Sequence, residues 1–407
     1  MLRCCAMADR PRILHLSGDY PDPIQPEKTQ AIARLLELTT GEFDHRVISL
    51  NRVSPSAREA ALLASGAGAA DAMIGLPTPF DRGLAFTYAA PPKGVLHQTA
   101  LVRLAQGLEH QLEHRLGQHW RKDWRPDLIV GHKLTIEGIV ARHLAQRLGV
   151  PFALSLQGNT DSRITAARPD LRHSFAAILR EARVVFPFAP WTLRLLEDRL
   201  GARTGPSIAL PCAFECDTMI APRAGGEVLV SVFHLAGHRW KNLRGMADAL
   251  SLLAKRDEEA RLEIVGGGSA ALAQSLAARF AKVPGLGFAG PIASADLPAR
   301  LNRAAGFVLP GLRESFGMVF TEALFAGLPI LYPAGRAVDG YFDDAPFALR
   351  VDPDEHHAIA DGMARLLRDE ARLKAALADW QSSADAQRFT RAGIGEAFAR
   401  GLRQALR

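Results

Sequence analysis

The sequence is poor in cysteine, with four residues among 407: Cys4, Cys5, Cys212 and Cys216. So few cysteines exclude the disulfide framework of a small secreted domain. Cys212 and Cys216 are close enough in sequence to share a metal ion, but no further Cys or His lies nearby at ligand spacing. We therefore expect free thiols and no bound metal.

Long hydrophobic runs are also absent, since no apolar run approaches the roughly 18 residues that span a bilayer. Residues 1–12 lack the apolar centre of a signal peptide, so we expect a cytoplasmic protein. Met7 is as good a start as Met1, because both lead into the same apolar segment. The net charge of +6 is modest, and the basic residues are scattered along the chain. As a binding partner, this favours a small anionic molecule or a membrane surface over nucleic acid.

Apolar segments of strand length alternate with segments of helical length along the chain. With 48% hydrophobic and 23% charged residues, the chain is globular and long enough for two domains. The predicted strands are residues 12–17, 45–50, 127–131, 151–156, 227–233, 261–265, 306–310 and 328–332. The main predicted helices are residues 27–38, 136–148, 243–255, 295–304 and 386–407, whereas residues 54–70 are expected to be loosely ordered. This alternation predicts parallel, doubly wound sheets.

The most informative segment is PGLRESFGMVFTEALFAGLP, residues 310–329. Glu314 precedes Gly317 in a loop, and Glu322 lies in an Ala/Leu-rich helical run. A loop that enters a helix offers free N–H groups to phosphate oxygens, and ionised carboxylates accept hydrogen bonds from vicinal hydroxyls. Two glutamates eight positions apart are commonly just solvated surface residues. Here, however, an apolar strand precedes the segment and another follows it. Ligands bind at the carboxyl ends of such strands. The segment therefore predicts a sugar-nucleotide site.

The E-x7-E spacing, with Phe316-Gly317 after the first Glu and Gly327-Leu328-Pro329 at the end, resembles the donor-site signature of family 4 glycosyltransferases. These are retaining enzymes among the glycosyl transferases group 1, and the similarity is strongest over residues 228–354. The resemblance implies the α/β GT-B fold, with two Rossmann-like doubly wound domains facing a cleft. It also implies sugar transfer, with retention and without a metal, from a UDP-, GDP- or ADP-linked donor. The acceptor would be a hydroxyl of a glycan, lipid-linked saccharide or cell-envelope polysaccharide.

The resemblance also suggests a division of the chain into four parts. We expect an acceptor-side domain at residues 1–216, a hinge at 217–226 and a nucleotide-sugar domain at 227–385. A terminal helix at 386–407 is expected to cross back to the first domain. Pro222 and the glycines at 225 and 226 suit a hinge.

On the donor side, the resemblance implies that Glu314 holds hydroxyls of the donor sugar and that Glu322 holds the ribose. The other implied contacts, to sugar, phosphate and base, are Phe316, Gly317, Met318, Pro291 and Ile292.

A basic loop follows the first strand of the second domain, and cations there would offset charge on the leaving diphosphate. Lys241 fits the family's lysine position, whereas His234 stands where the family usually has an arginine. Either Arg239 or a charged His234 would then supply the second cation. Solvated surface cations remain the alternative.

The first domain departs from the family. Lys28 and Thr29 replace its paired glycines, and they suit either an acceptor contact or a helix cap. Gln157, which cannot act as a base, stands where a histidine is common. The other acceptor-side candidates are His132, Asn159 and Asp161. No strong base is evident, which suits a retaining reaction in which the leaving phosphate takes the acceptor's proton.

Three alternatives remain open. A GT-B epimerase acting on sugar nucleotides would share the fold, and so would a non-catalytic binding subunit. The third alternative is peripheral membrane contact, which would use a stripe of leucines followed by Trp and basic residues at 119–125. The leucines of this stripe are residues 101, 104, 108, 112 and 116. Leucines at this spacing more often belong to a protein core.

Overall fold

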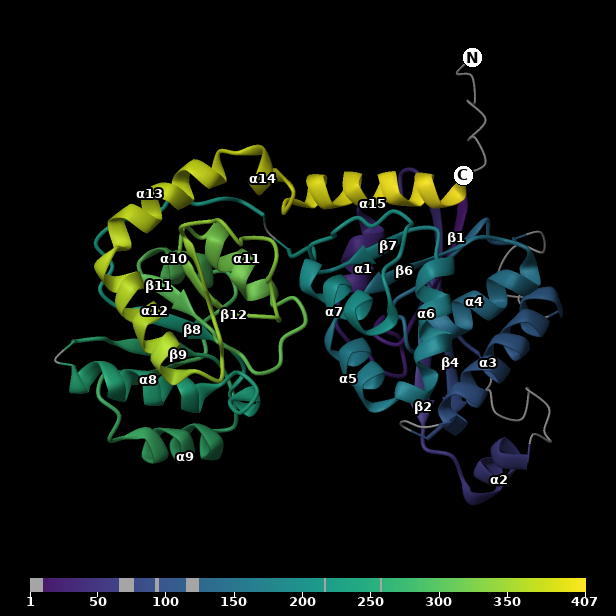
Figure 1. The fold of residues 1–407 in the computed structure, drawn as a ribbon, viewed down its shortest axis with the longest axis horizontal. Helices are drawn as coiled ribbons and strands as arrows, with labels where there is room; N and C mark the ends of the chain where they lie inside the picture. Colours follow the sequence, from purple (N-terminus) through teal and green to yellow (C-terminus); the bar gives the residue numbers. More distant parts are fainter. Residues whose placement is uncertain (1–9, 66–76, 92–94, 115–123, 216, 257) are drawn as a thin grey trace, which may run out of the picture. The chain divides into compact units, whose positions relative to one another are not determined.

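The computed structural model describes residues 10–65, 77–91, 95–114, 124–215, 217–256 and 258–407, which form two compact units (Figure 1). Unit 1 contains the described residues up to Phe188, together with Thr192–Leu210 and Ile394–Arg407. Unit 2 contains Ala189–Trp191 and Pro211–Gly393. Cys4, Cys5, Met7, Cys216 and most of the basic segment 119–125 lie outside the described residues.

Unit 1 is built on a sheet of seven described strands in the order β3-β4-β2-β1-β5-β6-β7. All neighbouring pairs are parallel except β3 and β4. The strands are β1 (Arg12–Ser17), β2 (Asp44–Val53), β3 (Thr78–Phe80), β4 (Gly83–Ala89), β5 (Leu128–Gly131), β6 (Phe152–Leu156) and β7 (Val185–Pro187). The helices are α1 (Ala31–Glu37), α2 (Ala57–Ser65), α3 (Val95–His114), α4 (Glu137–Leu148), α5 (Asn159–Ala167), η3 (Pro169–Leu171), α6 (Arg172–Glu181), α7 (Pro190–Leu200) and α15 (Arg391–Leu406).

Strand β1 shows how this sheet is covered on both faces, since successive side chains of a strand point in opposite directions. Leu14 and Leu16 are fully buried in an apolar cluster with residues of α3 and α4. His15 points the other way and lies beside Phe398 of α15. The last helix of the chain therefore covers the sheet of unit 1.

Four leucines of the stripe that allowed a membrane contact, at 101, 104, 108 and 112, belong to α3, whereas Leu116 lies outside the described residues. Leu101, Leu104 and Leu108 are each at most 1% exposed and pack in the core of unit 1. Among the described residues, no helix is both long and apolar enough to cross a bilayer.

The sheet of unit 2 has six described strands, all parallel, in the order β10-β9-β8-β11-β12-β13. These are β8 (Leu229–Val232), β9 (Leu262–Val265), β10 (Leu286–Gly290), β11 (Gly306–Val308), β12 (Ile330–Pro333) and β13 (Ala348–Val351). The helices are η4 (Leu235–Gly237), α8 (Leu243–Lys255), α9 (Ala270–Phe280), α10 (Leu297–Asn302), α11 (Met318–Phe325), α12 (His356–Arg368), α13 (Glu370–Gln381) and α14 (Ala384–Gln387). Helix α12 packs on α8 and on β11, β12 and β13.

Several predicted element ends are wrong. The first helix starts at Ala31 instead of residue 27, because the preceding residues form hydrogen-bonded turns around Asp22. Residues 57–65, expected to be loosely ordered, form α2. The terminal segment contains two helices, α14 and α15, because residues 388–390 close turns on α14.

Candidate functional site

The loops after β8 and β11 meet at the carboxyl edge of the unit 2 sheet. These strands are parallel neighbours, so their carboxyl ends lie side by side. The backbone N–H of Leu312 donates to the carbonyl of Trp240 at 2.8 Å, and that of Arg313 donates to the same oxygen at 3.3 Å. The basic loop and the loop that carries Glu314 are therefore joined through their backbones.

Lys241 and Glu314 form an ion pair at this junction. Lys241 Nζ donates to Glu314 Oε2 across a sequence separation of 73 residues. The side chains are 26% and 14% exposed, so both remain open to a ligand. Two residues that the sequence assigned to one site are thus brought together.

Asn242 fixes the turn that follows Lys241. Its φ is 60°, in the left-handed region that Asn tolerates better than most residues. Its buried Nδ2 donates to the carbonyls of Pro310 at 3.0 Å and Pro353 at 2.7 Å, and Oδ1 accepts from Gly245 N at 3.2 Å. One side chain therefore ties together the segments that follow β8, β11 and β13. The sequence did not reveal this role of Asn242.

Gly317 allows the loop to enter α11. Its φ is 73°, and a Cβ there would lie 2.7 Å from the Phe320 ring and 3.0 Å from Glu314 Cγ. Only glycine fits both constraints. Met318 opens α11, whose free N–H groups face this edge, and Glu322 follows one turn later with a partly buried side chain.

Phe316, also predicted to line the donor site, is buried and packs edge-on against Tyr341. Its side chain supports the loop, so only its backbone is available to a ligand.

The glycine turn after β9 packs against the loop after β8. A Cβ on Gly266 would lie 1.8 Å from the carbonyl oxygen of Phe233, so only glycine fits. The exposed His234 accepts a hydrogen bond from Ala236 N through Nδ1 at 3.3 Å and caps η4. A charged His234 would lose the cap.

Pro291 and Ile292 follow β10 at the same edge. The Cβ of Pro291 lies 3.8 Å from the Cβ position of Gly267, and Gly266 N donates to Gly290 O at 2.9 Å. The predicted base contacts therefore border the glycine turn.

Arg239 lines a different pocket, of about 500 Å³, together with Arg244, Arg279 and His356. Neither Lys241 nor Glu314 is part of that lining. The structure thus brings Lys241 to Glu314 and places Arg239 elsewhere.

In unit 1, Lys28 is held in a buried ion pair. Its Nζ lies 2.9 Å from Asp22 Oδ2, with side-chain exposures of 8% and 0%. Burial alone would raise the pKa of Asp22, but hydrogen bonds from Ser49, Asn51 and Lys28 lower it to about 2. Thr29 is exposed, and its Oγ1 accepts from Ala31 N at 3.3 Å. Neither residue is the N-cap of α1, which is Gln30 and makes no side-chain cap hydrogen bond.

His132 belongs to a buried chain of three histidines. His15 lies 3.0 Å from His132 and 2.9 Å from His45, and the chain ends at Ser155 and Thr39. Burial lowers the pKa of His132 to about 3 and that of His45 to about 4. These neutral rings lie inside the sheet, so the structure favours a packing role for His132.

Asp161 is fully buried and accepts hydrogen bonds from Leu134 N, Thr135 N and Thr135 Oγ1 at 2.7–3.1 Å. It therefore fastens the loop after β5 to α5. Asn159 opens α5 with a partly exposed side chain. Gln157 is also partly exposed, and its Nε2 has no hydrogen-bond partner within the described part of the chain.

A charged cluster at the carboxyl edge of unit 1 was missed from the sequence. Lys133 Nζ lies 2.7 Å from Asp19 Oδ2 and 3.4 Å from Glu137 Oε1, and Gly18 N donates to the same Glu137 oxygen at 2.6 Å. Burial raises the pKa of Glu137. Asp19 is the most accessible member, at 32% exposure. The sequence did contain a signal for this cluster: Asp19 follows the first predicted strand, and Lys133 and Glu137, four positions apart, follow the strand at residues 127–131.

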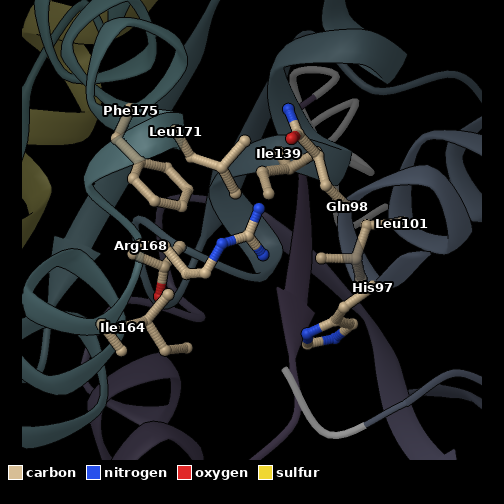
Figure 2. A pocket seen from close by; sticks show the side chains of 10 residues that line it. His97, Gln98, Leu101, Ile139, Ile164, Arg168, Leu171 and Phe175 are labelled. Carbon is tan, nitrogen blue, oxygen red and sulfur yellow. The ribbon is translucent and has the colours of Figure 1, made fainter. Parts of the chain in front are cut away.

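Unit 1 also contains a pocket between α3 and the α4–α6 region (Figure 2). Figure 2 shows His97 and Gln98 on one side, facing Arg168, Leu171 and Phe175. Its volume is about 20 Å³, which is room for about one water-sized molecule. It is too small for a sugar.

Most of the second unit is similar to a known protein family. Residues 222–383 match the profile of the family "Glycosyl transferases group 1". The matched residues include Lys241, Glu314 and Glu322.

Among curated proteins, the mannosylfructose-phosphate synthase of Agrobacterium fabrum is 30% identical to the chain over 189 residues. The match covers 44% of this chain and 41% of that protein, so it spans about two fifths of the relative's length.

Solved structures match almost the whole chain. A sucrose-phosphate synthase from Thermosynechococcus elongatus has a TM-score of 0.65 at 17% identity, covering 97% of this chain and 99% of its own. Anabaena HepE in complex with UDP and glucose has a TM-score of 0.58 at 15% identity, covering 96% and 99%. At these identities the likeness shows the fold, which confirms the predicted GT-B architecture of two parallel-sheet domains.

Proposed function

We propose that the protein is a glycosyltransferase that moves a sugar from a nucleotide-diphosphate donor to a hydroxyl acceptor. The observation that carries this proposal is the Lys241–Glu314 pair, at the loop entrance to α11 and inside the group 1 domain. A partly exposed cation and carboxylate beside free helix N–H groups suit a sugar diphosphate, which presents negative charge and hydroxyls together.

In the proposed reaction, the bond between the anomeric carbon and the diphosphate oxygen breaks, and both electrons stay on the diphosphate. Lys241 and the N-terminus of α11 stabilise that growing charge. Glu314 accepts hydrogen bonds from sugar hydroxyls, and Glu322 accepts them from the ribose. The acceptor oxygen bonds to the anomeric carbon and gives its proton to the departing diphosphate.

Retention of configuration and membership of family 4 belong to this proposal. Retention is supported by what unit 1 offers as a base. His132 is buried with a lowered pKa, Lys28 is engaged with Asp22, and the carboxylate of Asp19 is ion-paired with Lys133. None of the three is a good proton acceptor for the incoming hydroxyl, so proton transfer to the leaving phosphate is the simpler route.

UDP is the donor nucleotide that we favour, because the HepE structure of the same fold contains UDP. The names of two similar proteins, a mannosylfructose-phosphate synthase and a sucrose-phosphate synthase, describe products that are phosphorylated disaccharides. A sugar phosphate therefore joins the glycans and lipid-linked saccharides as a candidate acceptor. We place the acceptor with unit 1, near Asn159 and Asp19. A cytoplasmic location, with contact at the inner face of a membrane, stays a prediction from the sequence.

A thermal-shift screen with UDP, GDP, ADP and their common sugar conjugates tests the proposal. A ligand that binds only the folded state adds about 2.7 kcal/mol of stability at 100 times its Kd. We expect a shift with UDP and UDP-sugars that is lost in Glu322→Ala and kept in Lys282→Ala, a control at an exposed residue of unit 2. No shift with any nucleotide would contradict the proposal and favour a binding subunit.

A further inference from the structure

The pocket that contains Arg239 lies outside the proposed donor site. It has a volume of about 500 Å³, within the range of small-molecule sites. Helices α8 and α12 contribute residues from their N-terminal ends, and α9 contributes residues from its C-terminal end. Its charged and titratable lining residues are His238, Arg239, Arg244, Arg279, Asp354 and His356.

The charges of this pocket are strongly unbalanced, with three arginines against one aspartate. Arg239 is exposed and has no carboxylate partner among the described residues. Arg279 lies 5.4 Å from the centre of the Phe280 ring, and Arg244 makes a solvent-exposed contact of 3.6 Å with Asp248. An exposed pair of this kind neutralises little charge. Like charges gathered around one cavity repel each other, and a bound anion removes that cost.

Two further features suit a phosphate ester. Helix α12 begins at His356, and its N-cap residue Glu355 makes no side-chain cap hydrogen bond, so the first N–H groups of the helix have no side-chain cap from that residue. Phe280, Leu312 and Pro353 supply apolar surface for a carbon skeleton. Guanidinium groups bind phosphate through paired N–H groups.

The pocket shares one loop with the donor site. Arg239 lies two residues before Lys241, and Asn242, which lines the pocket, lies one residue after it. Asn242 also ties this loop to Pro310 and Pro353. A ligand in the pocket would therefore hold the backbone on both sides of Lys241.

We propose that this pocket binds a small phosphate-bearing metabolite, separately from the nucleotide sugar, and that binding stabilises the loop that carries Lys241. The proposed binding site is inferred from the pocket alone. The proposed effect of the ligand on the donor site rests on the proposed function.

The test is calorimetric titration of inorganic pyrophosphate into the full-length protein saturated with UDP. Wild-type protein should bind one pyrophosphate. The double variant Arg244→Ala/Arg279→Ala should bind it at least tenfold more weakly. The control Lys255→Ala/Lys282→Ala removes the same charge from exposed positions of the same unit and should stay within twofold of wild type. Arg279→Gln serves as a second variant if the double variant does not fold.

Equal affinity in the arginine variant and the lysine control would overturn the site, as would no pyrophosphate binding to the UDP-saturated wild type. If UDP itself does not bind, the proposed function fails, but the comparison of arginine variant and control in the absence of UDP still decides the pocket. Hydrogen exchange of residues 237–242 tests the link to Lys241. Pyrophosphate should slow it in the UDP-saturated wild type, and unchanged exchange would refute that link.

Discussion

The carboxyl edges of the two sheets carry similar charged residues, but these residues differ in how far they are exposed. In unit 1, Asp22 pairs with Lys28 and Asp161 binds backbone and hydroxyl groups of a neighbouring loop, all of them buried. In unit 2, Lys241 and Glu314 pair while both stay partly exposed. Apart from Asp19, which is 32% exposed, these strand-end charges of unit 1 thus serve internal stability, whereas Lys241 and Glu314 of unit 2 stay open to ligands. Exposure, more than residue type, separates the two roles.

Replacing the buried lysine gives the largest expected effect on stability. Lys28→Ala leaves Asp22 buried without its cation, and removal of one partner from a buried pair costs about 3 kcal/mol. Urea unfolding should show this loss, whereas the UDP affinity of the folded protein should stay unchanged. Lost UDP affinity without lost stability would reverse the roles that we assign to the two units.

Lys241→Ala should show the opposite pattern. A cation that stabilises charge in the transition state contributes about a hundredfold or more to turnover. Because Lys241 is partly exposed, the melting temperature should change little. Steady-state kinetics with a nucleotide-sugar donor, with Lys282→Ala as the matched control, measure the effect. Normal turnover in Lys241→Ala would remove this residue from the mechanism.

Asn242 is the exception in unit 2, because it is buried and fully bonded like the polar residues of unit 1. Asn242→Gly keeps the left-handed backbone accessible but removes three hydrogen bonds. We expect a loss of about 2 kcal/mol in unfolding free energy, together with reduced turnover because Lys241 loses its anchor. Unchanged kinetics in a destabilised variant would limit Asn242 to a role in folding.

The smallest expected effect is a pH dependence in unit 1. The pKa of Asp22 is lowered from its ordinary value to about 2 in the folded protein, so its ionised form favours folding. This stability is complete above pH 4 and is lost as the pH falls from about 4 to about 2. Melting temperatures measured across that range should fall less steeply in Asp22→Asn than in wild type. Parallel curves for the two proteins would contradict the assignment.

The strand-loop-helix-strand unit around Glu314 and Glu322 could be predicted because it depends on neighbouring residues: an apolar strand, a glycine and a helical run. The burial of Lys28 and His132 could not be predicted in this way. Lys28 contacts Ser49 of β2 and Asp22, which itself accepts a hydrogen bond from Asn51 of β2, and His132 contacts His15, 117 residues away. Such partners are not visible in a local pattern.

The separation of Arg239 from Lys241 was hidden for a related reason. The two residues lie two positions apart in one loop, so a shared role in offsetting the diphosphate charge was predicted for Lys241 and Arg239. The turn at η4 and the left-handed Asn242 orient that loop, and they leave Lys241 beside Glu314 while Arg239 lines another pocket. Propensity does not predict a non-glycine residue with positive φ at this position.

The most direct test of the difference between the two units is calorimetric titration of UDP into four proteins: wild type, Glu322→Ala, Lys28→Ala and Lys282→Ala. Our account predicts that UDP binds wild type, Lys28→Ala and Lys282→Ala with similar affinity, and Glu322→Ala at least tenfold more weakly. Equal binding by all four proteins, or binding lost through Lys28→Ala while that variant is folded, would contradict a donor site in unit 2.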